Sequence, residues 1–171
     1  MIHYLTPTRP ATPQAVHSAE VALGMRLPGQ YRRYLLTQAN GGWTDDALLP
    51  GFPHVAVNHI LGVDREDSDD LVRSCDRLAP LLGLGFLPVA DAEGGNPICI
   101  STRTEDFGTV WFHDHELDFD EDGAFTQITP SWDAFIDATQ PDTTPTPAPA
   151  EPAKVWVSAE METILRSQFA D

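Results

Sequence analysis

A proline-rich segment near the C-terminus sets the limit of the folded unit. Residues 139–153 read TQPDTTPTPAPAEPA, with five prolines and no large apolar side chain. Each proline fixes φ and removes a backbone donor, so a segment of this composition is typical of an extended linker. The sequence therefore predicts one domain over residues 1–138, a linker over residues 139–153 and a further element over residues 154–171.

This C-terminal element combines a short β-rich stretch, Val-Trp-Val at residues 155–157, with the pattern of an amphipathic helix. Ser158 is a typical N-cap, and apolar residues follow it at helical spacing, namely Met161, Ile164, Leu165 and Phe169. A helix this short is unstable unless its apolar side is covered. Docking on its own domain, homodimer formation through this helix and contact with a partner all remain open.

The rest of the chain has the pattern of a mixed α and β domain. Helices are expected over residues 12–23, 28–40 and 68–78 and from residue 131 onward, and strands over residues 54–63, 86–90, 97–101, 109–119 and 124–129. Helical crossovers, which a parallel sheet requires, are missing after residue 86. We expect an α+β fold in which helices pack at the N- and C-terminal ends of a mainly antiparallel sheet of about five to six strands.

The charge of the chain restricts its partners. It contains 26 Asp plus Glu against 10 Lys plus Arg, a formal net charge of −16. Nucleic acids and anionic membranes bind clustered Lys and Arg, so neither is expected as a direct partner, whereas a basic protein is favoured. The sequence shows no signal peptide and no stretch near the ~18 apolar residues of a membrane span. Cys75 and Cys99 lack CxxC spacing and are expected to be reduced, which favours a cytoplasmic protein.

The segment HDHELDFDEDG, residues 113–123, is the densest polar cluster in the sequence. If the segment is a strand, its acids at positions 114, 116, 118 and 120 share one face. A metal site on His113 and His115 needs a third ligand on their own face. A calcium loop that begins at Asp118 needs a bidentate Glu where Thr129 stands. We therefore expect an edge strand and neither a metal nor a cofactor.

Motifs for catalysis and phosphate binding are missing from the sequence. There is no G-x-S-x-G motif, and neither cysteine lies in a recognisable nucleophile context. The pairs Gly83-x-Gly85 and Gly94-Gly95 do not continue into a phosphate-binding loop. Because no set of residues combines an acid, a base and a nucleophile, we expect no enzymatic activity.

Several motifs in order resemble the SUKH superfamily, over residues 12–138. The first is EVALGMRLPGQYRRYLLTQANGG at residues 20–42, with a helix ending in Leu-Gly, then Leu-Pro, a Tyr-bearing helix and Asn-Gly-Gly. The second comprises LPVAD, GGN and ICI within residues 87–100, with Asn96 where the family more often has Asp. The third is GTVWFHDHE at residues 108–116, and SWDAFI at residues 131–136 is similar to the closing helix of the family.

The resemblance implies a binding protein with no catalytic residues. SUKH domains are largely bacterial immunity proteins that neutralise cognate polymorphic toxins, many of them nucleases, and a fungal branch regulates cell-wall assembly. A nuclease toxin is basic around its groove, and between Arg103 and Lys154 this chain has twelve acids and no Lys or Arg. We therefore expect a basic toxin domain as the partner.

The expected partner surface consists of one aromatic anchor, Trp43 in the loop after Asn40-Gly41-Gly42, and six acids. The acids are Asp114, Glu116, Asp118, Asp120, Glu121 and Asp122. Two alternatives stay open: the acids merely keep an edge strand from pairing, or the chain is a regulatory or scaffold module without a toxin partner.

Overall fold

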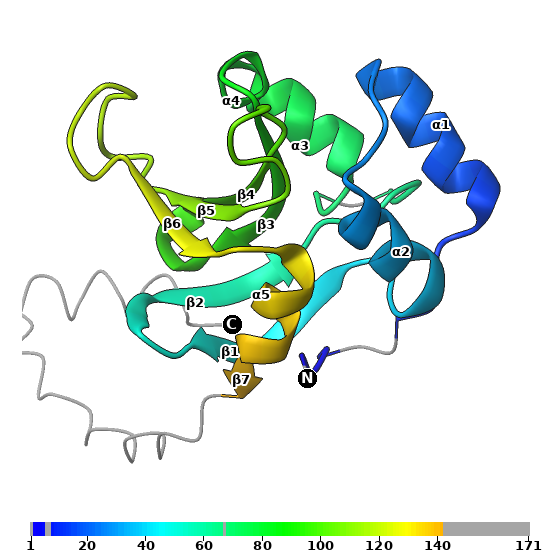
Figure 1. Cartoon of the computed structure of the whole chain (residues 1–171). Coiled ribbons are helices and arrows are strands. Elements are labelled where there is room, and N and C mark those ends of the chain that lie inside the picture. The colour runs from blue at the N-terminus through cyan, green and yellow to red at the C-terminus, as the bar shows by residue number, and fades with distance from the viewer. Residues whose placement is uncertain (1, 6–7, 67, 142–171) are drawn as a thin grey trace, which may run out of the picture.

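The computed structural model describes residues 2–5, 8–66 and 68–141, so the predicted element over residues 154–171 and most of the predicted linker lie outside it. Seven strands form one antiparallel sheet in the order β6-β5-β4-β3-β2-β1-β7 (Figure 1). The strands are β1 Gly42–Leu49, β2 Phe52–Ile60, β3 Phe86–Ala92, β4 Pro97–Ser101, β5 Val110–His113, β6 Phe125–Thr129 and β7 Gln140–Pro141. The described residues contain no helix with the length and apolarity that a membrane crossing requires.

Five α-helices lie within the described ranges, namely α1 Pro13–Leu23, α2 Gly29–Thr37, α3 Leu71–Arg77, α4 Ala79–Gly83 and α5 Trp132–Ala138. Local sequence explains where α1 and α5 begin. The Thr12 side chain accepts a hydrogen bond from the Ala15 N–H at the start of α1, and Ser131 accepts one from the Ala134 N–H at the start of α5. Gly24 ends α1 in the left-handed conformation. All three ends match the sequence prediction.

The α+β class and the antiparallel sheet are confirmed, but the sheet has seven strands rather than five to six, because β1 and β7 were not predicted. The strand expected over residues 109–119 covers only Val110–His113. Helix α3 begins at Leu71 instead of residue 68, because the Asp70 carboxylate caps it by accepting from the Arg73 N–H. Helix α4 is an additional short helix.

Strand β7 carries the sheet three residues past the predicted domain boundary. Gln140 pairs with Leu48 of β1, and Pro141 pairs with Ala47. Thr139, which precedes them, is fully buried and donates through its hydroxyl to the Phe135 carbonyl at 2.7 Å. The folded unit therefore includes residues 139–141, the first three residues of the proline-rich segment.

The two faces of the sheet bury two hydrophobic clusters of different size. Successive strand residues point to opposite faces, and accordingly Ile98 belongs to the larger cluster whereas Cys99 belongs to the smaller. Helices α1, α2, α3 and α5 contribute to the larger cluster, in which Trp132 packs edge-on against Tyr31 at a ring-centroid distance of 5.0 Å. Helix α4 contributes Leu81 to the smaller cluster. We call the face with the smaller cluster the second face.

The turn after α2 lies directly against the end of β2. A Cβ atom on Gly41 would lie 2.4 Å from the Ile60 carbonyl oxygen, and a Cβ atom on Gly62 would lie 2.2 Å from the Asn40 carbonyl oxygen. The Asn40 side chain holds the two segments together, since its Nδ2 donates to the Val63 carbonyl and its Oδ1 accepts from the Val63 N–H, both at 2.8 Å. We call this contact, made by Asn40, Gly41, Gly62 and Val63, the turn–strand junction.

Two glycines with the same φ of 67° separate the cost of backbone strain from the cost of this close approach. Gly41→Ala would put an alanine in the left-handed conformation and also press its Cβ against the Ile60 carbonyl. Gly24→Ala would add only the conformational strain, because no atom lies within 4 Å of its added Cβ. We expect Gly24→Ala to lower the free energy of unfolding by ~1 kcal/mol and Gly41→Ala by ~3 kcal/mol or more. Urea denaturation measures both, and equal losses would contradict the close approach.

Candidate functional site

Residues 114–123, which we call the acidic loop, connect β5 to β6 and contain all six of the predicted site acids. The loop consists of successive turns, in which the Leu117 N–H donates to the Asp114 carbonyl at 3.2 Å and the Glu121 N–H donates to the Asp118 carbonyl at 3.0 Å. The prediction that Asp114, Glu116, Asp118 and Asp120 share one face of a strand is therefore wrong, because β5 ends at His113. Asp side chains favour turns because they bond to nearby backbone groups, and here that preference outweighs the alternating pattern.

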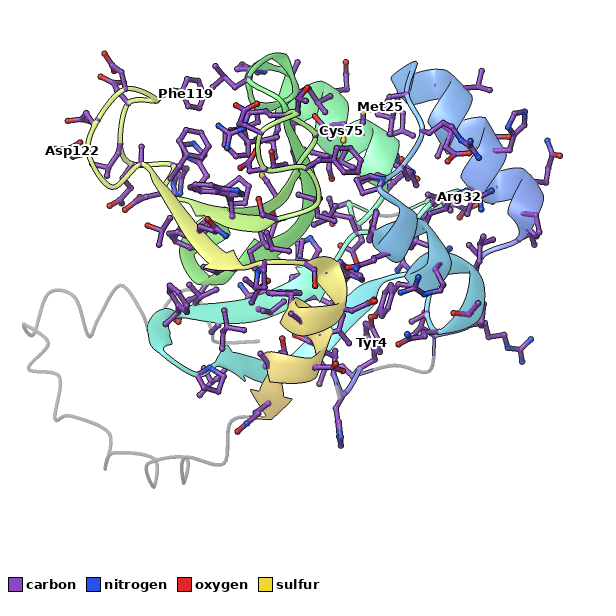
Figure 2. All side chains as sticks on the ribbon, viewed as in Figure 1. Tyr4, Met25, Arg32, Cys75, Phe119 and Asp122 are labelled. Carbon is purple, nitrogen blue, oxygen red and sulfur yellow. The ribbon has the colours of Figure 1, made fainter. Side chains whose placement is uncertain are left out.

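An aromatic stack fixes the acidic loop to the second face of the sheet. The Phe119 ring lies 5.2 Å from the His113 ring, which stacks at 4.6 Å on Phe125 of β6. The His113 Nδ1 lies 2.9 Å from the Ala124 carbonyl oxygen, which closes the base of the loop. Figure 2 shows Phe119 on the inner side of the loop and Asp122 on its outer side. The stack therefore holds the loop in place while its outer side faces solvent.

The six acids fall into two groups. Asp114 and Glu121 are structural, since Asp114 Oδ1 accepts from the Glu116 N–H at 3.0 Å and Glu121 Oε2 accepts from the Asp118 N–H at 2.7 Å. The other four side chains are exposed and make no hydrogen bond or ion pair with any described residue; they are Glu116, Asp118, Asp120 and Asp122. These four, which we call the free acids, are available for contact with a partner.

The two histidines of the segment have separate partners. His113 contacts the Ala124 carbonyl, as described above, whereas His115 contacts Asn96 in the turn between β3 and β4. The Asn96 Oδ1 accepts from the His115 backbone N–H at 3.0 Å and lies 2.8 Å from its Nδ1. Within the described ranges, no group of three or more His, Cys, Asp or Glu side chains is arranged to hold a metal ion.

Trp43 lies on strand β1 and not in a loop, which corrects the sequence prediction. Its side chain is half exposed, and its ring lies 4.8 Å from the ring of His59 on β2. The buried His59 places its Nε2 3.0 Å from Asp91 Oδ2 and 3.6 Å from Asp69 Oδ1. Trp43 therefore rests on a buried polar cluster, and a side chain supported in this way loses little conformational entropy when a partner binds.

Sequence reasoning missed the cluster under Trp43 and the two supports of the acidic loop. His59, Asp69 and Asp91 are far apart in the sequence, and the pairing of β2 with β3 brings His59 opposite Asp91. No signal in the sequence links Asn96 to His115, 19 residues away. Phe119 is a large aromatic residue between two acids, and an aromatic side chain in such a polar segment indicates that it packs against the domain and anchors the loop.

Trp43 and the acidic loop lie at the two ends of one row of residues across the sheet. Trp43 pairs with His59, His59 with Asp91, and Asp91 with Pro97. His113 continues this row on β5 and directly precedes the loop. Four strand spacings of ~4.8 Å, or roughly 19 Å, separate the two ends. Directly opposed residues of antiparallel strands share a face, so Trp43 and the loop form two separate parts of one surface.

Both cysteines are free, as expected, and fully buried. Burial raises the pKa of the Cys75 thiol to about 12 and that of the Cys99 thiol well above its ordinary value. Both thiols are therefore protonated at neutral pH. Because the thiolate is the nucleophilic form, the two cysteines serve as packing groups.

The chain was also compared with protein-family models. Residues 10–138 match the model of the SMI1/KNR4 family (SUKH-1). The chain belongs to this family. The SUKH-1 match includes the turn–strand junction, Trp43 and the whole acidic loop, whereas β7 follows it. A search of curated proteins found no match to the chain.

The division of the loop acids predicts two classes of substitution. Asp114→Ala removes the acceptor of the Glu116 N–H, so we expect the amides of Glu116 and Leu117 to exchange about tenfold faster and the protein to lose ~1 kcal/mol of stability. Asp120→Ala removes a free acid, and its exchange pattern should match that of the wild type, with stability within ~0.5 kcal/mol. Hydrogen exchange followed by NMR measures both variants. Equal effects of the two substitutions would contradict the division.

Proposed function

We propose that this SUKH-1 protein is a non-enzymatic binding protein, an immunity protein that neutralises a cognate toxin domain by direct contact. The partner it fits is a basic domain, such as a nuclease. The observation that carries this proposal is the acidic loop, which holds four free acids on a fixed backbone.

The distribution of charge supports a basic partner. From residue 104 to residue 141 there is no Lys or Arg, and the eight arginines of the described ranges all lie between residues 9 and 103. No cation of the chain therefore neutralises the free acids from a neighbouring position in the sequence. Such a one-sided field attracts a basic surface and increases the rate of association.

The dimensions of the surface also suit a protein partner. A standard interface covers about 800 Å² on each side, a patch roughly 30 Å across. The roughly 19 Å between Trp43 and the acidic loop fits within such a patch. A single toxin domain is thus large enough to contact the aromatic anchor and the free acids together.

The free acids can be tested by charge neutralisation. A variant with Glu116→Gln, Asp118→Asn, Asp120→Asn and Asp122→Asn should bind the cognate toxin domain with an association rate ~10–100-fold lower at low salt. A matched control with the same net charge carries Glu66→Gln, Asp76→Asn, Glu105→Gln and Asp137→Asn, all at exposed positions. Stopped-flow measurements over a salt series should show a flatter salt dependence for the loop variant alone. Equal rates for the two variants would refute the role of the loop.

Trp43 can be tested with a second exposed aromatic residue as the control. Trp43→Ala should raise the Kd for the same toxin domain by ~30-fold or more, mainly through faster dissociation, because aromatic anchors dominate interface energy. Phe107→Ala removes a side chain of similar exposure, outside the row that joins Trp43 to the acidic loop, and should leave the Kd unchanged. Surface plasmon resonance measures both, and a loss for Phe107→Ala alone would place the interface elsewhere.

A regulatory or scaffold role is the competing outcome of these experiments. It is indicated if the gene neighbourhood encodes no toxin domain and the protein instead binds several partners with modest affinity. Deletion of residues 142–171 then tests the C-terminal element, and this boundary keeps β7 intact. Loss of those partners without unfolding would make the C-terminal element the working part of the protein.

A further inference from the structure

The two edge strands of the sheet differ in whether their outer sides are paired. On one edge, the outer side of β1 is covered twice, by β7 opposite Ala47 and Leu48 and by a bridge between Tyr4 and Thr44. On the other edge, no described strand pairs with the outer side of β6. An open edge presents unpaired backbone groups to solvent and is a template for another strand.

Strand β6 lacks the charges and prolines that often block an edge, and its pairing with β5 is irregular only between Gln127 and Thr129. Its sequence, Phe-Thr-Gln-Ile-Thr, contains no charged residue and no proline, and Thr126 and Gln127 are exposed. The charges that border it lie in the acidic loop, which joins its N-terminal end through Ala124. The edge is therefore neutral along its length and strongly acidic at one end.

The hydrogen-bonding register shows which backbone groups of β6 point outward. The Asp114 N–H donates to the Ala124 carbonyl at 2.9 Å, so the carbonyl of Ala124 faces β5. Because this direction alternates along an antiparallel ladder, Thr126 also faces β5. The N–H and C=O groups of Phe125 and Gln127 are then directed away from the sheet.

We propose that the partner binds by adding a strand to the open edge of β6, with basic side chains of that strand beside the acidic loop. This inference rests on the proposed function and specifies how the partner is recognised. Main-chain hydrogen bonds to Phe125 and Gln127 supply affinity, and the free acids select for positive charge. The occupant is a basic strand and not a second copy of this chain, since two molecules with a net charge of −16 repel each other.

The experiment uses a defined probe and the full-length, ¹⁵N-labelled protein. The probe is the basic peptide Ac-KVRVTVKV-amide, and its matched controls are the same peptide N-methylated at every central amide and a peptide with Glu in place of Lys and Arg. We expect the basic peptide to slow exchange of the Phe125 and Gln127 amides at least tenfold, with the Thr126 amide unchanged. The N-methylated peptide should bind at least tenfold more weakly, because it can no longer donate to the Phe125 and Gln127 carbonyl oxygens. The Glu peptide should not bind.

A variant of the protein tests the same edge with the same peptide. Gln127→Pro removes an outward N–H, and should weaken peptide binding to the same extent as N-methylation of the peptide. If this variant does not fold, the comparison of the methylated and unmethylated peptides tests strand addition without it. Equal binding of the methylated and unmethylated peptides, or protection at sites other than Phe125 and Gln127, would overturn strand addition.

The other occupants of the edge have distinct signatures, and each would overturn the proposal. Protection of Phe125 and Gln127 that rises with protein concentration, without peptide, indicates a second copy. Protection that disappears on deletion of residues 142–171 indicates the chain's own C-terminal segment. Because the peptide experiment uses no toxin, its failure is distinguishable from that of the proposed function. A folded Gln127→Pro variant that binds a toxin domain normally would overturn strand addition and leave the immunity role in place.

Discussion

The fold depends on the close backbone approach at the turn–strand junction. Around it, the Tyr31 hydroxyl of α2 donates to the Leu61 carbonyl at 2.7 Å, and the Gly62 N–H donates to the Asp69 carbonyl at 2.9 Å. The Leu71 N–H at the start of α3 then donates to the Gly62 carbonyl at 2.7 Å. A helix, the end of a strand and the start of the next helix therefore share one set of buried backbone bonds. Buried backbone groups need such partners, so the junction satisfies them for three elements at once.

The geometry of the proposed partner surface depends on this junction. Trp43 follows Gly41 by two residues, so the position of the turn sets where β1 begins and which residue of β2 it meets. The pairing of Trp43 with His59 then sets the row that runs through Asp91 toward the acidic loop. A shift of one residue would turn Trp43 to the opposite face. The glycines at the junction thus determine the orientation of a side chain that they do not contact.

The sequence predicted the features that depend on neighbouring residues and missed those that depend on pairing. Helices α1 and α5 carry their own N-caps, and the sequence predicts both ends of α1 and the start of α5. Strand β1, Gly-Trp-Thr-Asp-Asp-Ala-Leu-Leu, has neither alternation nor β-branched runs, and its pairing with β2 makes it a strand. In the acidic loop, Leu117 and Phe119 alternate with acids as in a strand, yet the local bonds of Asp114 and Glu121 produce turns. The prediction that the six acids form part of a partner surface stays a prediction, and their division into structural and free acids required the structure.

The two interpretations of the acidic loop, as a guard of the edge strand and as a recognition surface, follow from the same electrostatics. A fixed negative loop at the end of β6 repels an acidic strand and attracts a basic one, so it lowers self-association and favours a basic partner at once. The stack of His113, Phe119 and Phe125 joins the loop to the edge strand in one rigid unit. A partner strand bound to β6 as proposed would therefore meet a loop whose backbone is already ordered, and little backbone entropy would be lost on binding. In the proposed mode of binding, low self-association and specificity for a basic partner would both follow from one arrangement of charge beside an open edge.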